Sequence, residues 1–232
     1  MPYKNKTHNE IIAIDGPAGS GKSTVAKGVA KRFGFLYVDT GAIYRALTLA
    51  AIKEKINLRD RKALAKLAAR ADIQLNMRGD SLRVALDGKD VSRAIREQSL
   101  TEKVCCVAAI KEVRDELVKM QRKLAKKAKG AVLEGRDIGT VVFPEAKYKF
   151  YLDAWPDERT RRRFKELRQM GQKVKVEGIA EDIEKRDKSD MTREVAPLAR
   201  ARDAVYIDTT ELSVEDVVEK ISSLIGNSRC SI

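Results

Sequence analysis

The sequence has no apolar run long enough to cross a membrane, and it has few cysteines. The apolar run nearest the N-terminus covers only residues 11–14, whereas a membrane-spanning helix needs about 20 residues. Of the three cysteines, Cys105 and Cys106 are adjacent, which suits neither a disulfide framework nor a metal-ligand spacing. We therefore expect a soluble, cytoplasmic protein with no membrane partner.

Histidine and aromatic side chains are scarce as well. The single histidine, His8, lies in a polar N-terminal tail that we expect to fray, and we assign it no ligand or acid–base role. Aromatic residues make up 5% of the chain and form no pattern that resembles a base-stacking platform. This shortage argues against a nucleic-acid partner.

Positive charge, by contrast, is in excess, with a net charge of +13. Composition leaves three interpretations open: nucleic-acid binding, a site for two or more polyanionic small molecules, or a basic surface with no target. The 43% hydrophobic content is enough for one large domain, or for a main domain with a small insert.

Short apolar segments alternate with helical patterns along the chain, which predicts a parallel α/β sheet. The segments expected to form strands are residues 11–14, 35–38, 131–134, 149–153 and 205–208. Residues 72–77 and 81–86 alternate apolar and polar side chains, which predicts an inserted β-hairpin. Helices are expected over residues 62–71, 157–170, 179–188 and 214–225. Ser213, with Asp216 three residues later, predicts the N-cap of the last of them.

Residues 16–23 match the phosphate-binding Walker A pattern Gly-x-x-x-x-Gly-Lys-Ser. The glycines allow backbone N–H groups to point toward one anion, and the following helix adds its positive dipole end. We expect Lys22 to reach the β- and γ-phosphates and the Ser23 hydroxyl to bind magnesium. The expected ATP contacts are Gly16, Pro17, Ala18, Gly19, Ser20, Gly21, Lys22, Ser23 and Thr24. This P-loop, placed between a predicted strand and a predicted helix, indicates an ATP-using phosphotransferase.

Arginines further along the chain suit a second, phosphorylated substrate, and the base-reading Asn-Lys-x-Asp segment of a GTPase is missing. Guanidinium groups neutralise phosphates through bidentate contacts, so Arg45 and Arg136 are candidates. Arg159, Arg162 and Arg163 share one helical face at i, i+3 and i+4 spacing. An ordinary solvated helix face would show the same spacing, and the sequence leaves that alternative open.

Four motifs together resemble those of bacterial cytidylate kinase. They are Gly-Pro-x-Gly-x-Gly-Lys-Ser at 16–23, Asp-Thr-Gly-Ala-Ile-Tyr-Arg at 39–45, Glu-Gly-Arg-Asp-Ile-Gly-Thr-Val-Val-Phe-Pro at 134–144 and Arg-Asp-x-x-Asp-x-x-Arg-x-x-x-Pro-Leu at 186–198. The resemblance implies transfer of the γ-phosphoryl group of ATP to CMP or dCMP, with Mg²⁺. It also implies an α/β nucleoside-monophosphate kinase fold, with a five-stranded parallel sheet flanked by helices, a small β-rich insert and a helical lid.

The resemblance further implies a role for each matching residue. The residues implied to hold the acceptor phosphate are Thr40, Arg45, Arg136 and Arg193. Those implied to contact the ribose are Arg186 and Asp190, and those implied to read cytosine are Arg114 and Asp137. Cys105 is a further substrate-binding candidate, which either contacts the base or only fills space. The implied catalytic groups are Lys22, Arg136, Arg159, Arg162 and Arg163, the last three on the lid that closes on ATP, with Ser23 as the metal ligand.

Simpler structural roles remain open for several of these residues. Asp190 and Arg193 have the spacing of an ordinary helical ion pair, Asp137 lies in a glycine-rich turn, and Asp39 precedes a helix that it could cap. Taken together and in family order, the motifs favour the binding roles.

One position departs from the family, which usually has serine where this chain has Cys105; a thiol is the weaker hydrogen-bonding group. On one straight helix, Cys105 and Arg114 would point to opposite faces. Both can face a base only if the helix breaks between them, near Lys111, and a continuous helix over residues 110–113 would exclude a shared role.

The implied division of the chain has three parts. The core comprises residues 1–40, 130–156 and 198–232, the acceptor-binding part residues 41–129 with the hairpin near 72–90, and the lid and acceptor-binding helices residues 157–197. We expect a monomer that binds ATP and CMP or dCMP and no nucleic acid. The alternatives are a small-molecule kinase with another acceptor, such as UMP, and a P-loop protein that binds nucleic acid.

Overall fold

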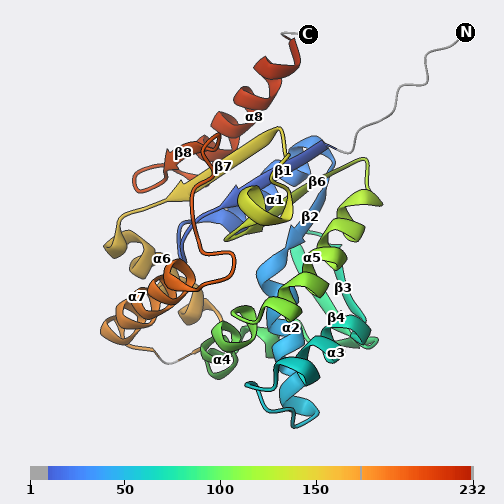
Figure 1. Cartoon of the computed structure of the whole chain (residues 1–232). Coiled ribbons are helices and arrows are strands. Elements are labelled where there is room, and N and C mark those ends of the chain that lie inside the picture. The colour runs from blue at the N-terminus through green and yellow to red at the C-terminus, as the bar shows by residue number, and fades with distance from the viewer. Residues whose placement is uncertain (1–9, 173, 231–232) are drawn as a thin grey trace, which may run out of the picture.

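A five-stranded parallel sheet forms the centre of the computed structural model, which describes residues 10–172 and 174–230 (Figure 1). Its strands, in spatial order, are β2 (Leu36–Asp39), β6 (Gly130–Gly135), β1 (Glu10–Asp15), β7 (Tyr148–Asp153) and β8 (Val205–Asp208). The central strands β1 and β6 are mostly apolar and buried, as expected of strands covered on both faces. The predicted parallel α/β sheet is confirmed, while His8 lies outside the described residues.

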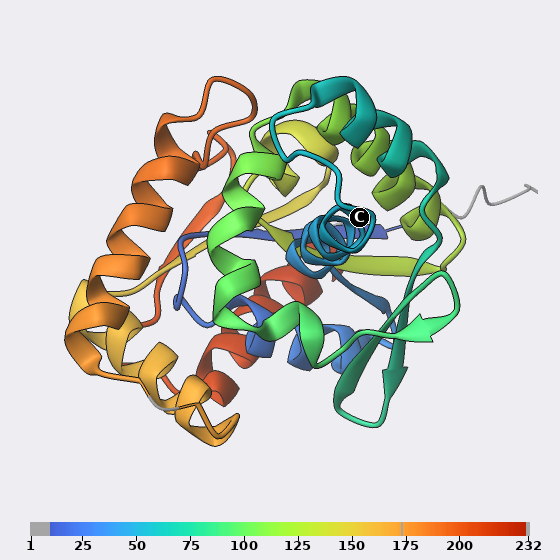
Figure 2. The same cartoon turned by 90° about the horizontal axis from the view of Figure 1, so that it is seen from below.

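Helices cover both faces of this sheet. Figure 2 shows α1 (Lys22–Phe33) and α8 (Val214–Cys230) on one side and α5 (Lys111–Lys126) on the other. The predicted capping box of α8 is present, because the Asp216 N–H donates to the Ser213 hydroxyl at 3.1 Å and the Ser213 N–H donates to the Asp216 carboxylate at 3.1 Å. No helix in the described part of the chain combines the length and the apolar character that a membrane span requires.

The predicted hairpin lies between α3 (Arg61–Arg70) and the short helix η1 (Ala94–Arg96). Its strands β3 (Ile73–Arg78) and β4 (Ser81–Leu86) pair antiparallel, and β5 (Lys89–Asp90) adds a third, short strand. Gly79 has a φ of 60°, a left-handed conformation that glycine adopts without strain, so the two-residue turn closes where the sequence predicts.

A break separates α4 (Gln98–Ala108) from α5. The backbone at Ile110 is extended, with φ −84° and ψ 119°, and the Arg114 guanidinium donates to the Ala108 carbonyl at 2.9 Å. The helix thus breaks between Cys105 and Arg114, which is the condition under which both residues could face one base. No proline or glycine marks the break; Ile110 is buried, and burial of its side chain accompanies the turn.

Two helices outside the sheet layers follow β7. They are α6 (Pro156–Gln169) and α7 (Val176–Thr192), which pack on each other through a small core of Leu167, Ile179 and Ile183. The helix α2 (Thr40–Lys53) follows β2 and begins at the same edge of the sheet as the P-loop. The ends of the parallel strands, α2 and the α6–α7 pair thus surround one region of the molecule (Figure 1).

Candidate active site

The P-loop connects the end of β1 to the first residue of α1. Gly16, Gly19 and Gly21 have positive φ values of 149°, 77° and 87°. A Cβ atom at Gly16 would lie 2.0 Å from the Leu152 carbonyl oxygen, so only glycine fits there. The loop therefore has the conformation that turns backbone N–H groups toward an anion at the start of α1.

Lys22 is buried at the centre of this loop. Its ammonium donates to the Pro17 carbonyl at 2.5 Å and to the Ser20 hydroxyl at 3.4 Å. Burial, and then the positive charge of Arg136, lower the pKa of Lys22 to about 7. An anion bound in the loop would oppose both effects and restore the charge of the lysine.

Two carboxylates near the P-loop were not predicted from the sequence. Asp15, the last residue of β1, accepts from the backbone N–H groups of Ile138 and Gly139 at 2.8 and 2.7 Å; burial raises its pKa to about 7 although these hydrogen bonds lower it. Glu134, in β6, accepts from the Tyr37 hydroxyl at 2.9 Å, and burial, followed by the charge of Asp39, raises its pKa. The signal that could have found both is their place at the carboxyl ends of neighbouring parallel strands, which meet at one edge.

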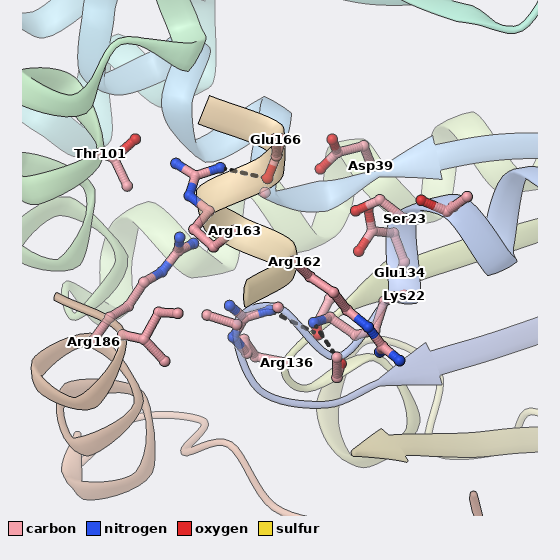
Figure 3. Close-up of a pocket in the computed structure, with 18 of the residues that line it drawn as sticks. Lys22, Ser23, Asp39, Thr101, Glu134, Arg136, Arg162, Arg163, Glu166 and Arg186 are labelled. Atoms are coloured by element: carbon pink, nitrogen blue, oxygen red, sulfur yellow. Dashed lines mark hydrogen bonds and ion pairs between the residues drawn. The ribbon is translucent and has the colours of Figure 1, made fainter. Parts of the chain in front are cut away.

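A cleft of about 870 Å³ opens in front of the P-loop. Figure 3 shows Lys22, Ser23 and Glu134 at one end, Arg163, Arg186 and Thr101 at the other, and Arg136 and Arg162 between them. Residues 18–24 of the P-loop line the cleft, whereas Gly16 and Pro17 do not. Several cleft residues besides Glu134 were missed because no motif marks them: Lys27, Arg96, Gln98 and Thr101.

Opposite the P-loop, five of the predicted residues form a chain of alternating charges. Arg136 donates to Asp190 at 2.8 Å, Asp190 pairs with Arg193 at 3.4 Å, and Arg193 lies 3.7 Å from Asp137, which pairs with Arg114. Although burial alone raises the pKa of Asp190, Arg136 and its neighbouring arginines lower it, so this carboxylate is ionised. The Asp190–Arg193 helical pair exists, as the simpler interpretation predicts, but both residues also have partners on other elements.

The other predicted arginines differ in what they contact. Arg45 pairs with Asp39 at 3.2 Å, and Asp39 also caps α2 by accepting from the Ala42 N–H at 2.7 Å. Among the described residues, Arg186 has no hydrogen bond or ion pair; burial, and then Arg136, lower its pKa to about 10. Such a half-buried cation at the cleft wall is available to an anionic or hydroxyl-bearing ligand.

Of the three predicted arginines on α6, two line the cleft and one does not. Arg162 donates to the Thr209 hydroxyl at 2.8 Å and to Glu158 at 2.7 Å, and Arg163 donates to Glu166 at 2.7 Å. Arg159 is absent from the cleft wall and contacts Ala18 and Asp187 instead. The three arginines on this face of α6 therefore all have partners within the protein, and two of them also line the cleft. Both interpretations of their spacing, nucleotide binding and an ordinary helix face, stay open.

Of Thr40 and Cys105, only Thr40 lines the cleft. The Thr40 hydroxyl, in the cleft wall, donates to the Glu134 carbonyl at 2.8 Å. Cys105 does not line the cleft; its thiol donates to the Glu102 carbonyl at 3.1 Å, and burial raises its pKa. The residues of α4 that line the cleft besides Gln98 are Thr101, Val104 and Ala108.

Comparisons with known proteins agree with this geometry. The family model described as "Cytidylate kinase" matches residues 12–227. A cytidylate kinase of Caldanaerobacter subterraneus subsp. tengcongensis is 51% identical over 214 residues, covering 92% of this chain and 93% of that protein. The cytidylate kinase of Bacillus subtilis is 48% identical over 210 residues, covering 90% and 93%. Among solved structures, an uncharacterized protein from Eubacterium ventriosum has a TM-score of 0.51 at 15% identity, covering 94% of this chain and 99% of that one, a likeness of fold alone.

Proposed function

The chain belongs to the cytidylate kinase family and is a kinase, and from this premise we propose that it transfers the γ-phosphoryl group of ATP to CMP or dCMP. One observation supports this proposal above the others: the charged chain from Arg136 to Arg114 faces the P-loop across a single cleft. A triphosphate at Lys22 and a monophosphate at Arg136 would meet in that cleft. Both ends come from one chain, so the proposal needs no second subunit.

The donor end would hold ATP by backbone N–H groups and charge. Lys22 and the start of α1 suit the β- and γ-phosphates, and Arg162 and Arg163 are cations in the cleft wall that can neutralise charge during transfer. Magnesium would be held near the Ser23 hydroxyl and the neighbouring carboxylates Glu134 and Asp39, an oxygen set that suits this ion. When bound, it would supply further neutralisation of phosphate charge.

The acceptor end offers partners for each part of a cytidine monophosphate. Arg136 and Arg45 suit its phosphate, and Arg186 and Asp190 its ribose hydroxyls, because an ionised carboxylate accepts from both. Asp137 could accept from the exocyclic amine of cytosine, where uracil presents a carbonyl oxygen that a carboxylate repels. Among the described side chains, the free thiols of Cys105 and Cys106 suit a reducing compartment, and we place the reaction in the cytoplasm.

A panel of acceptors tests this proposal. With ATP and Mg²⁺, we expect ADP release with CMP and dCMP, and a kcat/KM at least about 100-fold lower with UMP or AMP, because an unpaired or repelled base edge costs much of the binding free energy. A coupled assay of ADP release measures each acceptor. A preference for UMP would instead support the alternative small-molecule kinase, and binding of RNA or DNA without kinase activity would support the nucleic-acid alternative.

Nucleotide binding should also take up a proton at alkaline pH. The pKa of Lys22 is lowered to about 7, so at about pH 8 the group is mostly neutral, and a bound triphosphate should restore its charge. We expect uptake of roughly one proton per site at about pH 8 and almost none at about pH 6, where Lys22 is already protonated. Calorimetric titration with Mg²⁺ and adenylyl imidodiphosphate in buffers of different ionisation enthalpy measures this uptake. Equal heats in all buffers at pH 8, or the same uptake in Lys22→Met, would contradict the assignment.

A further inference from the structure

Side chains from α6 and α7 form hydrogen bonds with both backbone polar groups of Ala18 in the P-loop. The Ala18 N–H donates to the Asp187 carboxylate, on α7, at 3.0 Å, and the Ala18 carbonyl accepts from the Arg159 guanidinium, on α6, at 3.1 Å. Asp187 and Arg159 are themselves an ion pair, and Asp187 is buried. The three residues therefore form a closed ring that joins α6, α7 and the P-loop.

Packing around this ring is close. The side chain of Ala18 packs against the small core that α6 and α7 share, and a Cβ atom at the next residue, Gly19, would lie 2.8 Å from the Arg159 carbonyl oxygen. The Arg159 guanidinium also donates to the Ala154 carbonyl at 3.1 Å, before the start of α6. A shift of α6 or α7 therefore cannot leave the P-loop backbone unchanged.

The same helix α7 carries the residues that face the acceptor end of the cleft. Asp187 lies between Arg186 and Asp190, and Asp190 accepts from Arg136 at 2.8 Å. A helix moves as one body over so short a stretch, so a ligand that draws Asp190 or Arg186 toward itself changes the position of Asp187 against Ala18. Neither Asp187 nor Arg159 lines the cleft, so neither is placed to touch a bound nucleotide.

We propose that Asp187, through its pair with Arg159, is a positioning residue that couples acceptor binding on α7 to the ATP-binding conformation of the P-loop. The proposal rests on the proposed function, because it takes ATP and CMP as the ligands. Coupling of this kind is reciprocal: if CMP tightens the binding of the ATP analogue, the analogue tightens the binding of CMP by the same factor. The chemical step needs nothing from Asp187 itself.

Binding titrations with and without the second ligand test this coupling. Mg²⁺ and adenylyl imidodiphosphate serve as the donor probe, and CMP as the acceptor; the single tryptophan, Trp155, at the start of α6 and 65% exposed, supplies a fluorescence signal. In the wild type we expect saturating CMP to lower the Kd of the analogue about 10-fold, within the usual range of coupling between sites. In Asp187→Asn, which keeps an acceptor for the Ala18 N–H but loses the charge that pairs with Arg159, we expect this factor to fall below about 2-fold.

Two further variants separate coupling from stability. Arg159→Gln removes the other half of the ion pair from a different helix and should lose the coupling as Asp187→Asn does, while the Kd of CMP alone stays within about 2-fold of the wild type. Asp203→Asn breaks another carboxylate–cation pair, with Lys149 at 2.7 Å, outside the cleft wall, and should keep the full coupling. A structural role alone would lower the melting temperature without changing the coupling factor.

The outcomes of these titrations distinguish failure of the coupling from failure of the proposed function. Wild-type protein that binds both ligands without coupling, or variants Asp187→Asn and Arg159→Gln that keep the full factor, would overturn the inference and leave the proposed function standing. Wild-type protein that binds neither ligand would overturn the proposed function, and the inference with it.

Discussion

Replacing Lys22 with alanine should lower kcat by about 1,000-fold or more while the fold stays intact. The ammonium lies inside the P-loop, and the chemistry proposed for the cleft depends on neutralising the charge of the transferred phosphoryl group. A loss of this size corresponds to about 4 kcal/mol of transition-state stabilisation, which is the scale of one well-placed charged donor in a dry site. Steady-state kinetics with saturating ATP and CMP measure it.

The stability of this variant should not fall appreciably, and the reason follows from the lowered pKa of Lys22. Because the pKa of Lys22 is lowered to about 7, the unfolded chain binds more protons at this group than the folded protein between about pH 7 and 10, so the group makes stability rise with pH in that window. Below about pH 7, the buried ammonium of Lys22 lowers the free energy of unfolding, because its charge is removed from water. Lys22→Ala removes this unfavourable contribution. We therefore expect the melting temperature to fall by no more than about 4 °C, and a rise would agree with the loss of that contribution.

A matched change on the same helix serves as the control. Lys31 is exposed and pairs with Asp80 at 3.1 Å, so Lys31→Ala removes a lysine of α1 that has no contact with the cleft. It should keep full activity. Turnover by Lys22→Ala within tenfold of the wild type would remove the phosphate role from this lysine.

Replacing Arg136 with alanine should lower kcat/KM for CMP by about 1,000-fold. Its guanidinium donates to Asp190, and its charge is the strongest of the neighbouring charges that lower the pKa of Lys22, so it lies between the two ends of the cleft. The variant would lose a cation at the point where the two phosphates meet. It would also leave the buried Asp190 with Arg193 at 3.4 Å as its remaining ion-pair partner among the described residues.

Two companion variants sharpen this measurement. Arg136→Lys keeps the charge but not the planar fork, so it should recover part of the activity. Arg122→Ala removes an arginine that donates to the Val142 and Val141 carbonyls at 2.8 and 3.1 Å, outside the cleft wall, and should leave kcat/KM unchanged. If Arg136→Ala and Arg122→Ala behaved alike, Arg136 would have no special place in transfer.

The loss of a positive neighbour should also show in the titration of Lys22. Burial is the larger cause of the lowered pKa, and Arg136 is the next, so Arg136→Ala should raise the pKa of Lys22 while leaving it below its ordinary value. Proton uptake on nucleotide binding at about pH 8 should therefore decrease in this variant, because more of the lysine is already charged before binding.

The features that the sequence predicted well are those whose cause is local. A glycine pattern between an apolar strand and a helix specifies the P-loop, because backbone angles at Gly16, Gly19 and Gly21 depend on residue type. The hairpin at residues 73–86 and the cap of α8 follow from turn and capping chemistry over a few residues. The resemblance to a family added the residues expected at the acceptor end. The structure brings five of them together through ion pairs, and their roles stay predictions: Arg136, Asp190, Arg193, Asp137 and Arg114.

Contacts between side chains on different elements of the fold could not be predicted from the sequence. The spacing of Arg159, Arg162 and Arg163 is the same whether they face a nucleotide or the protein, and only the packing of α6 against the P-loop turns Arg159 toward Ala18 and Asp187. The break at Ile110 has no proline or glycine, so no local residue preference predicts it; the structure shows an extended backbone and a buried side chain there.

The sequence by itself thus determined the parallel sheet, the P-loop and which charged residues are candidates for the cleft. Each of these depends on side-chain type and on spacing along the chain. The tertiary structure alone decided that Asp15 accepts from Ile138 and Gly139, that Glu134 lies beside Lys22 and Ser23, that Thr101 rather than Cys105 lines the cleft, and that Asp187 joins α7 to Ala18. These are contacts between residues far apart in sequence, up to 169 positions for Ala18 and Asp187. They form because buried polar groups must find partners wherever the packed elements bring them, and no local pattern records where that is.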